Sequence, residues 1–182
     1  MFKLILLIGI ILFYTGCIPN TYYSTTDDYA TGARWYDRGN YEYAVRYWEP
    51  LVLKGDCDAE NAMGMAYLLG KGKKQNKDKA VALFKKAANG NQQMAQARLG
   101  DLYDPMNEGY LYCKTCEKDI VQSYKWYKLS ERYAKYDSEK EYAKKLIKIT
   151  IKKMTKEQII EGDKLVQNWK PTPKDCNPRQ WW

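Results

Sequence analysis

The middle of the chain repeats itself at a fixed interval, and this limits the folds open to it more than any other feature. Gly64 and Gly100 lie 36 residues apart. Three more pairs share that interval, and all are small or apolar: Ala59 and Ala95, Met63 and Leu99, Tyr67 and Tyr103. A period of this length is typical of repeat proteins, in which similar units stack side by side. The sequence therefore predicts a stacked array.

Each unit has the pattern of two helices. Apolar residues recur at helical spacing over residues 59–69 and again over residues 78–88. Gly70-Lys71-Gly72 separates the two segments, and Asn89-Gly90-Asn91 ends the second one. We therefore predict an all-α fold of helix–turn–helix units.

Small residues at fixed places in the unit predict close helix contacts. Gly64 and Gly100 would let a neighbouring helix approach, and the aromatic residue three positions later, Tyr67 or Tyr103, would fill the space beside the glycine. Ala80 would be the small residue of the second helix. We assign these five residues a structural role, and we expect a larger side chain at either glycine to force the helices apart.

One motif runs through the first unit: Ala59-x4-Gly64-x2-Tyr67-x2-Gly70-x-Gly72, then Asp78-Lys79-Ala80-x2-Leu83-Phe84-x2-Ala87-Ala88. It resembles the Sel1-like repeat, a variant of the tetratricopeptide repeat with a longer turn. The second unit matches over residues 95–103 and, after an insertion, over residues 123–130. The resemblance implies an α-solenoid of about four helix pairs over residues 27–170.

The units at the two ends depart from this motif. Gly32 and Trp35 keep the glycine-to-aromatic spacing but precede a shorter turn, as in an ordinary tetratricopeptide repeat. Residues 138–153 read as one lysine-rich helix. Thr155-x-x-Gln158 is a capping box, which predicts a final helix to about residue 169. Residues 171–182 are then a C-terminal tail.

The first residues have the pattern of an export signal. Lys3 precedes an apolar run over residues 4–13, which is too short to span a bilayer. The run ends at Tyr14-Thr15-Gly16-Cys17, which resembles the bacterial lipobox, whose cysteine is acylated. We expect a signal peptide over residues 1–16, a lipid on Cys17 and a tether over residues 17–26. A plain secretory signal and an uncleaved anchor are the alternatives.

The residue after Cys17 bears on where the protein is sorted. It is Ile18 rather than aspartate. In lipoproteins of bacteria with two membranes, the resemblance then implies sorting to the outer membrane. We therefore expect an exported, periplasmic protein that is held at the outer membrane by its lipid.

If Cys17 is acylated, four cysteines remain: Cys57, Cys113, Cys116 and Cys176. An even number in an exported protein favours disulfides. Cys113 and Cys116 lie in the insertion, and we predict a local disulfide between them. A zinc site would need a second such pair or histidines, so no metal is expected. Cys57 and Cys176 should lie on one edge of the solenoid, but their pairing stays open, and either could bridge to another chain.

The composition and the motifs of the sequence argue against a catalytic function. The chain has no histidine, which removes the usual general base at neutral pH. None of its serines stands in an S-x-x-K motif. We therefore expect no catalytic residue, no cofactor and no small-molecule substrate, and a hydrolase is the alternative of another class. The net charge is +8 without a nucleic-acid motif, so no nucleic acid is expected as a partner.

A stacked array of helices has a concave groove, which in the related tetratricopeptide repeats is lined by the first helix of each pair. On that geometry the candidate partner-binding residues are Tyr29, Ala33, Tyr36, Asn61, Met65, Leu68, Ala97, Asp101 and Asp104. Some of them could instead complete the core. A second candidate is a stripe of four lysines at helical spacing: Lys140, Lys144, Lys148 and Lys152. It is either a solvated helix face or a contact for an acidic partner or an anionic bilayer.

Together these patterns predict a non-catalytic protein–protein interaction module of the bacterial cell envelope, which binds a protein through the concave face. The resemblance implies roles such as adaptor, envelope-assembly factor or host-interaction factor. The alternative is an immunity protein that neutralises a secreted antibacterial toxin in the periplasm. The sequence does not name the partner.

Overall fold

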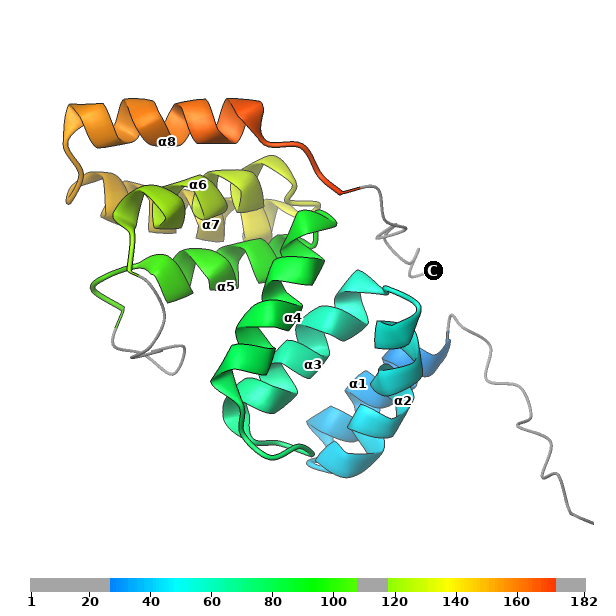
Figure 1. Ribbon diagram of the computed structural model, residues 1–182. Helices are drawn as coiled ribbons and strands as arrows, with labels where there is room; N and C mark the ends of the chain where they lie inside the picture. Colours follow the sequence, from blue (N-terminus) through cyan, green and yellow to red (C-terminus); the bar gives the residue numbers. More distant parts are fainter. Residues whose placement is uncertain (1–26, 108–117, 173–182) are drawn as a thin grey trace, which may run out of the picture.

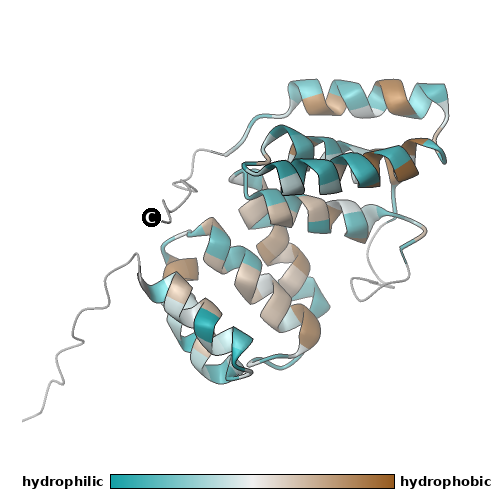
Figure 2. Ribbon diagram, turned by 180° about the vertical axis from the view of Figure 1, so that it is seen from behind, coloured by the Kyte–Doolittle hydropathy of each residue, from teal (hydrophilic) through white to brown (hydrophobic). Residues whose placement is uncertain are grey.

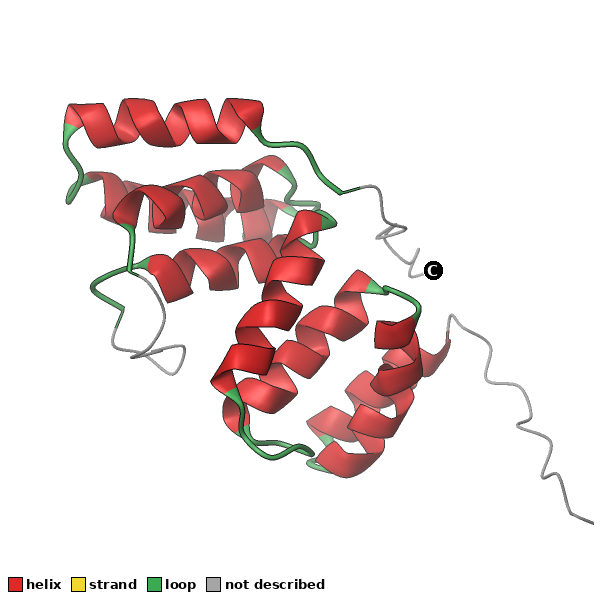
Figure 3. Cartoon of the chain, in the orientation of Figure 1, coloured by secondary structure: helices red, strands yellow, loops and turns green. Residues whose placement is uncertain are grey.

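The computed structural model describes residues 27–107 and 118–172, and within these ranges the chain forms eight α-helices and no strand (Figure 3). The helices are α1 (Asp27–Asp37), α2 (Tyr41–Leu53), α3 (Cys57–Leu69), α4 (Lys77–Asn89), α5 (Gln93–Tyr103), α6 (Ile120–Arg132), α7 (Asp137–Ile151) and α8 (Lys156–Asn168). The prediction of an all-α fold is confirmed.

Helices α1 to α7 each pack mainly against their neighbours along the chain, so the helices form a stack (Figure 1). The pairs α1–α2, α3–α4 and α5–α6 are helix hairpins joined by short turns or, for the last pair, by the insertion. The far end of the stack departs from this pairing, because α7 and α8 both pack on α6. Apolar and polar residues are interspersed along the helices, as in amphipathic helices that turn one side toward a core (Figure 2).

Polar side chains fix where the helices begin. Asp56 and Asn76 accept hydrogen bonds from backbone N–H groups in the first turns of α3 and α4. Thr155 and Gln158 form the capping box that the sequence predicts: Gln158 N donates to Thr155 Oγ1 over 3.2 Å, and Thr155 N donates to Gln158 Oε1 over 2.9 Å. These caps satisfy N–H groups that a helix leaves without a partner.

The long turn after α3 depends on a glycine. Gly72 has a φ of 73°, in the left-handed region that favours glycine. A side chain there would also meet the backbone carbonyl of Tyr41 at the start of α2. The turn between α3 and α4 therefore lies close against α2 of the preceding helix pair.

Glycines also set the distance between helices. A methyl group on Gly64 would lie 2.6 Å from Cε1 of Phe84, and one on Gly100 would meet the ring of Tyr127. The prediction that Gly64 and Gly100 mark close helix contacts is therefore confirmed. The rings that cover them come from the second helices, however, and not from Tyr67 and Tyr103 as predicted.

The same contact occurs at both ends of the stack. Gly32 of α1 faces the ring of Trp48, and Gly162 of α8 faces the ring of Tyr124. On the second helices of the first three pairs, each ring follows a buried small residue by four positions: Ala44 and Trp48, Ala80 and Phe84, Ser123 and Tyr127. Ala80 is thus the buried small residue of its second helix, the role that the sequence predicts for it.

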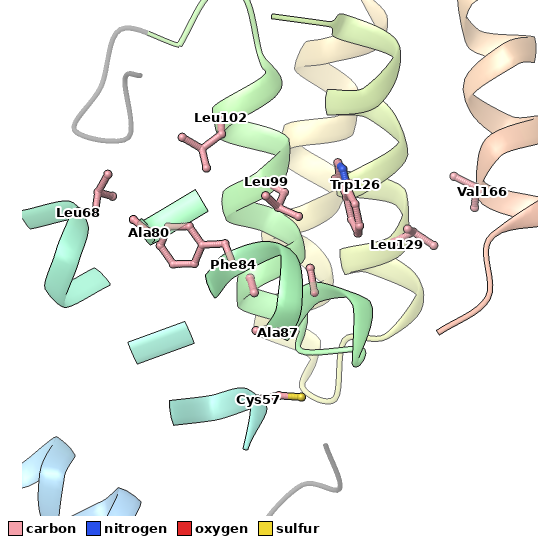
Figure 4. Packing of buried hydrophobic residues seen from close by; sticks show 12 residues of the cluster. Cys57, Leu68, Ala80, Phe84, Ala87, Leu99, Leu102, Trp126, Leu129 and Val166 are labelled. Carbon is pink, nitrogen blue, oxygen red and sulfur yellow. The ribbon is translucent and has the colours of Figure 1, made fainter. Parts of the chain in front are cut away.

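The core consists of two clusters. The first cluster joins α1, α2 and α3 through residues such as Trp48, Leu51 and Met63. The second runs from α3 to α8 and includes Phe84 and Leu99 (Figure 4). Tyr67 packs against both clusters, so it lies at the seam between them.

Candidate functional site

Three of the residues predicted to line the groove lie in the interior: Ala97 of α5 is 2% exposed, and the other two belong to α3. Leu68 is only 2% exposed and belongs to the second cluster. Asn61 is 7% exposed, and its side-chain oxygen accepts a hydrogen bond from Nη1 of Arg98 on α5. Both side chains hold helices together, which corrects their assignment to the partner-binding surface.

The two predicted tyrosines of α1 are half-buried in an aromatic cluster. The Tyr29 and Tyr36 rings lie 6.2 Å and 5.6 Å from the ring of Trp48, measured between centroids. The ammonium group of Lys71 lies 5.5 Å from the Tyr36 ring centroid and 4.8 Å from that of Tyr41. Burial raises the pKa of Tyr36 above its ordinary value, so the phenol stays neutral.

Asp101 of α5 and Asp104, which directly follows this helix, are also engaged in internal bonds. The Tyr127 hydroxyl donates to Oδ1 of Asp101 over 2.7 Å. Burial raises the pKa of Asp101, although the Tyr127 hydroxyl and Arg98 act in the opposite direction. Asp104 accepts a hydrogen bond from the backbone N–H of Met106. Met65 of α3 is half-buried against the second cluster. A partner-binding role for these residues stays a prediction.

An opening lies elsewhere, over the second helices of the first two pairs. An apolar groove of about 500 Å³ runs between α2 and α4 above α3. It is lined by Glu49, Val52, Leu53, Met63, Tyr67, Lys79, Ala82, Leu83 and Lys86. Its volume falls in the range of protein pockets that bind ligands or anchor side chains of a partner. We refer to it below as the apolar groove.

The exposure of Leu53 sets this groove apart from the core. Leu53 is 89% exposed at the end of α2, whereas Met63 at the base of the groove is 3% exposed. An apolar side chain with that exposure loses its contact with water only when another molecule covers it. The groove therefore offers an apolar surface to a partner.

The margin of the groove is basic. Lys79 and Lys86 of α4 are exposed beside it, and the Lys79 ammonium lies 5.4 Å from the centroid of the Tyr67 ring. Its one carboxylate, Glu49, forms a salt bridge with Lys73, and this bond raises the pKa of Lys73. The margin thus favours a partner with acidic groups.

The sequence contains a signal for this groove, and it lies on a second helix rather than on the first helices that were predicted to line a groove. Ala44, Trp48 and Leu51 mark the buried stripe of α2. Leu53 follows Leu51 by two positions and is therefore on another side of the helix. A large apolar residue off the buried stripe, at a helix end, is the feature that could have pointed to the groove.

The predicted lysine stripe lies on α7 beside a smaller, charged cleft. The cleft has about 260 Å³ and is lined by Lys128, Glu131, Arg132, Lys140 and Val166. Lys144 pairs with Glu141 over 2.7 Å, and Lys128 with Glu131 over 3.6 Å. One lysine of the stripe, Lys144, is thus paired with a carboxylate, and exposed ion pairs of this kind contribute little energy.

In residues 27–107 and 118–172, no group of histidine, cysteine, aspartate or glutamate is arranged to hold a metal ion. No helix in the part of the chain that the structure describes is long and apolar enough to cross a membrane. Cys17, Cys113 and Cys116 lie outside the described residues. Cys57 is 3% exposed and is disulfide-bonded.

Comparison with known proteins agrees with this geometry. Residues 57–92 and 93–131 each match the family described as the Sel1 repeat. The fold is similar to that of c5321, a protective antigen present in uropathogenic Escherichia coli strains that displays an SLR fold. That structure is 26% identical, with a TM-score of 0.67, and the match covers 80% of this chain and 30% of the antigen.

A second solved structure is a Sel1 repeat protein from Oxalobacter formigenes, at 26% identity and a TM-score of 0.50. The match covers 58% of this chain and 39% of that protein. The chain therefore spans well under half the length of both structures. Comparison with curated proteins gives no match.

Proposed function

This chain is a Sel1 repeat protein, and on that premise we propose that it is a protein–protein interaction module that binds its partner in the apolar groove. The observation that carries the proposal is the 89% exposure of Leu53 at the edge of a groove of about 500 Å³. An exposed apolar patch rimmed by polar residues is typical of a surface that binds another protein.

The groove also limits the chemistry of the partner. Val52, Leu53 and Leu83 would contact apolar side chains, while Lys79 and Lys86 would contact carboxylates beside them. The partner segment is therefore apolar in the middle and acidic at its flanks. Because exposed charges are screened by salt, its binding should weaken as ionic strength rises.

We place this activity in the cell envelope, with Cys17 as the lipid anchor at the outer membrane. The apolar run over residues 4–13 and the lipobox-like residues that follow support export. The disulfide on Cys57 adds support, because disulfides persist in oxidising compartments. An immunity protein against a secreted toxin would be one form of this module, and the identity of the bound partner would distinguish it from an adaptor.

The test is site-specific photocrosslinking in the producing bacterium. A photoreactive residue replaces Ala82, which is exposed and lines the groove. We expect one discrete protein adduct, whose yield falls at least about tenfold when Leu53→Glu is added, because the loss of one anchor residue costs about 1.4 kcal/mol or more.

Ile160→Glu is the matched control. Ile160 is also an exposed apolar residue, at 68%, but it lies on α8, away from the groove. Adduct formation should be unchanged in this variant. An adduct whose yield is insensitive to Leu53→Glu, or falls equally with Ile160→Glu, would show that the groove does not hold the partner.

A further inference from the structure

Helix α7 turns a basic face away from the stack. Its buried residues, Ala143 and Thr150, lie seven residues apart on the side that packs on α6. Lys145, Lys148 and Lys152 lie on the opposite side of the helix, and all three are exposed. In Figure 1 α7 lies behind α6, so in Figure 2 it lies in front, where its outer side is mostly hydrophilic. We refer to these three lysines as the lysine face.

The charge of this part of the chain has one sign. Residues 142–156 contain six lysines and no aspartate or glutamate. One of the six, Lys144, pairs with Glu141 over 2.7 Å, and within residues 27–107 and 118–172 the other five form no salt bridge. The lysine face thus carries positive charge that no carboxylate in these ranges contacts.

Exposed isoleucines flank the lysine face. Ile149 is 43% exposed and Ile151 is 37% exposed, although burial of an isoleucine side chain stabilises a protein. Around the helix, the two isoleucines lie on either side of the lysines. Basic side chains beside exposed apolar ones are typical of a helix that lies on a membrane surface.

Two kinds of partner carry the charge that this face requires: an acidic protein and an anionic bilayer. We propose that the lysine face is a docking surface for an anionic lipid bilayer. α7 contains no arginine, the side chain that binds carboxylates in a fixed bidentate geometry. Lysine is a point charge on a flexible stem, which suits lipid phosphates whose positions are not fixed. The isoleucines would contact the boundary between headgroups and acyl chains.

This surface is separate from the site of the proposed function. The apolar groove lies between α2 and α4, toward the other end of the stack. The inference rests on neither the groove nor a lipid on Cys17, because all of its residues belong to α7 and the turn that follows. Its test therefore fails or succeeds independently of partner binding in the groove.

The test uses the full chain, in which a fluorescent amino acid replaces Ile149 beside the lysine face. The vesicles contain a lipid with a nitroxide on its headgroup, which quenches only nearby fluorophores. We expect quenching on vesicles of phosphatidylglycerol and phosphatidylcholine in equal amounts, and little on phosphatidylcholine alone. The second composition accounts for the apolar run over residues 4–13, which would bind either kind of vesicle. The same probe at Leu53, which is 89% exposed on α2, gives the background.

A triple variant tests the charge: Lys145→Gln, Lys148→Gln and Lys152→Gln. Each lysine near an anionic surface contributes to binding, so the loss of three should weaken the contact about a hundredfold. The quenching at position 149 should then disappear on the anionic vesicles.

A matched control removes the same charge from exposed lysines outside α7, and it should keep the quenching: Lys54→Gln, Lys74→Gln and Lys85→Gln. Equal loss in both triple variants would overturn the proposal, because net charge and not the lysine face would then hold the vesicle. Equal quenching on the two kinds of vesicle, or equal quenching at positions 53 and 149, would overturn it as well. A probe at position 149 that stays unquenched on both would overturn it and leave an acidic protein as the partner of this face.

Discussion

At the scale of single residues, glycines occur inside helices where the neighbouring helix leaves no room for a side chain. Glycine inside a helix costs about 1 kcal/mol relative to alanine, so its presence at Gly64 and Gly100 must be offset by packing. The offset is the contact with the Phe84 and Tyr127 rings. The glycines could be predicted from their spacing. Their ring partners could not, because the turn lengths differ: 20 residues separate Gly64 from Phe84, but 27 separate Gly100 from Tyr127.

We predict that Gly64→Ala destabilises the protein, although alanine is the better helix former. The new methyl group would lie 2.6 Å from Phe84, and overpacking of this kind costs about 1–3 kcal/mol, which exceeds the gain in helix propensity. Urea denaturation should show that the free energy of unfolding falls by about 1–2 kcal/mol.

Phe84→Leu supplies the control for that substitution. Gly64→Ala should lower the free energy of unfolding by less in the Phe84→Leu background than in the wild type, because the two side chains compete for the same space. A Gly64→Ala protein that is more stable than the wild type would contradict the packing argument.

At the scale of helices, local sequence determines where each helix begins and ends, but it does not determine which other helices it packs against. The sequence predicts the capping box at Thr155 and the turn glycines, and the structure has both. The packing of α7 and α8 on α6 could not be predicted from the motif. It depends on Gly162 facing Tyr124, a contact across 38 residues that lies outside the repeat period. Similarly, the apolar groove between α2 and α4 could not be predicted from the motif, because it depends on how the helices pack against each other.

The cap of α8 gives a prediction at this scale. Thr155→Ala removes the acceptor for the Gln158 N–H and should cost about 1 kcal/mol. Hydrogen exchange should show faster exchange of the amides in the first turn of α8 than in the wild type. Thr155→Ser keeps the oxygen and should restore protection. Equal exchange in the alanine and serine variants would mean that the hydroxyl has no capping role.

At the scale of the whole molecule, the apolar groove lies at the seam between the two core clusters. Tyr67 packs against both clusters and also lines the groove. In a repeat protein, the free energy of unfolding is a sum of contributions from the units and from the interfaces between them. The units on the two sides of a weakened interface can therefore unfold separately. A partner bound in the groove would contact α2 and α4 together and would strengthen that interface.

Tyr67→Ala should therefore uncouple the first helix pair from the rest of the array. Removal of the ring takes packing from both clusters, whereas Tyr133→Ala affects only the second. We expect amides of α1 and α2 to exchange at least about tenfold faster than those of α6 in Tyr67→Ala, because local openings then cost less than global unfolding.

Urea denaturation of Tyr67→Ala should correspondingly separate into two transitions, while Tyr67→Phe, which keeps the ring, and Tyr133→Ala keep one. A single transition with an unchanged slope in Tyr67→Ala would locate the coupling in other contacts between α2 and α3. In that event the groove would lie over a rigid unit, and a bound partner would raise its stability without changing its cooperativity.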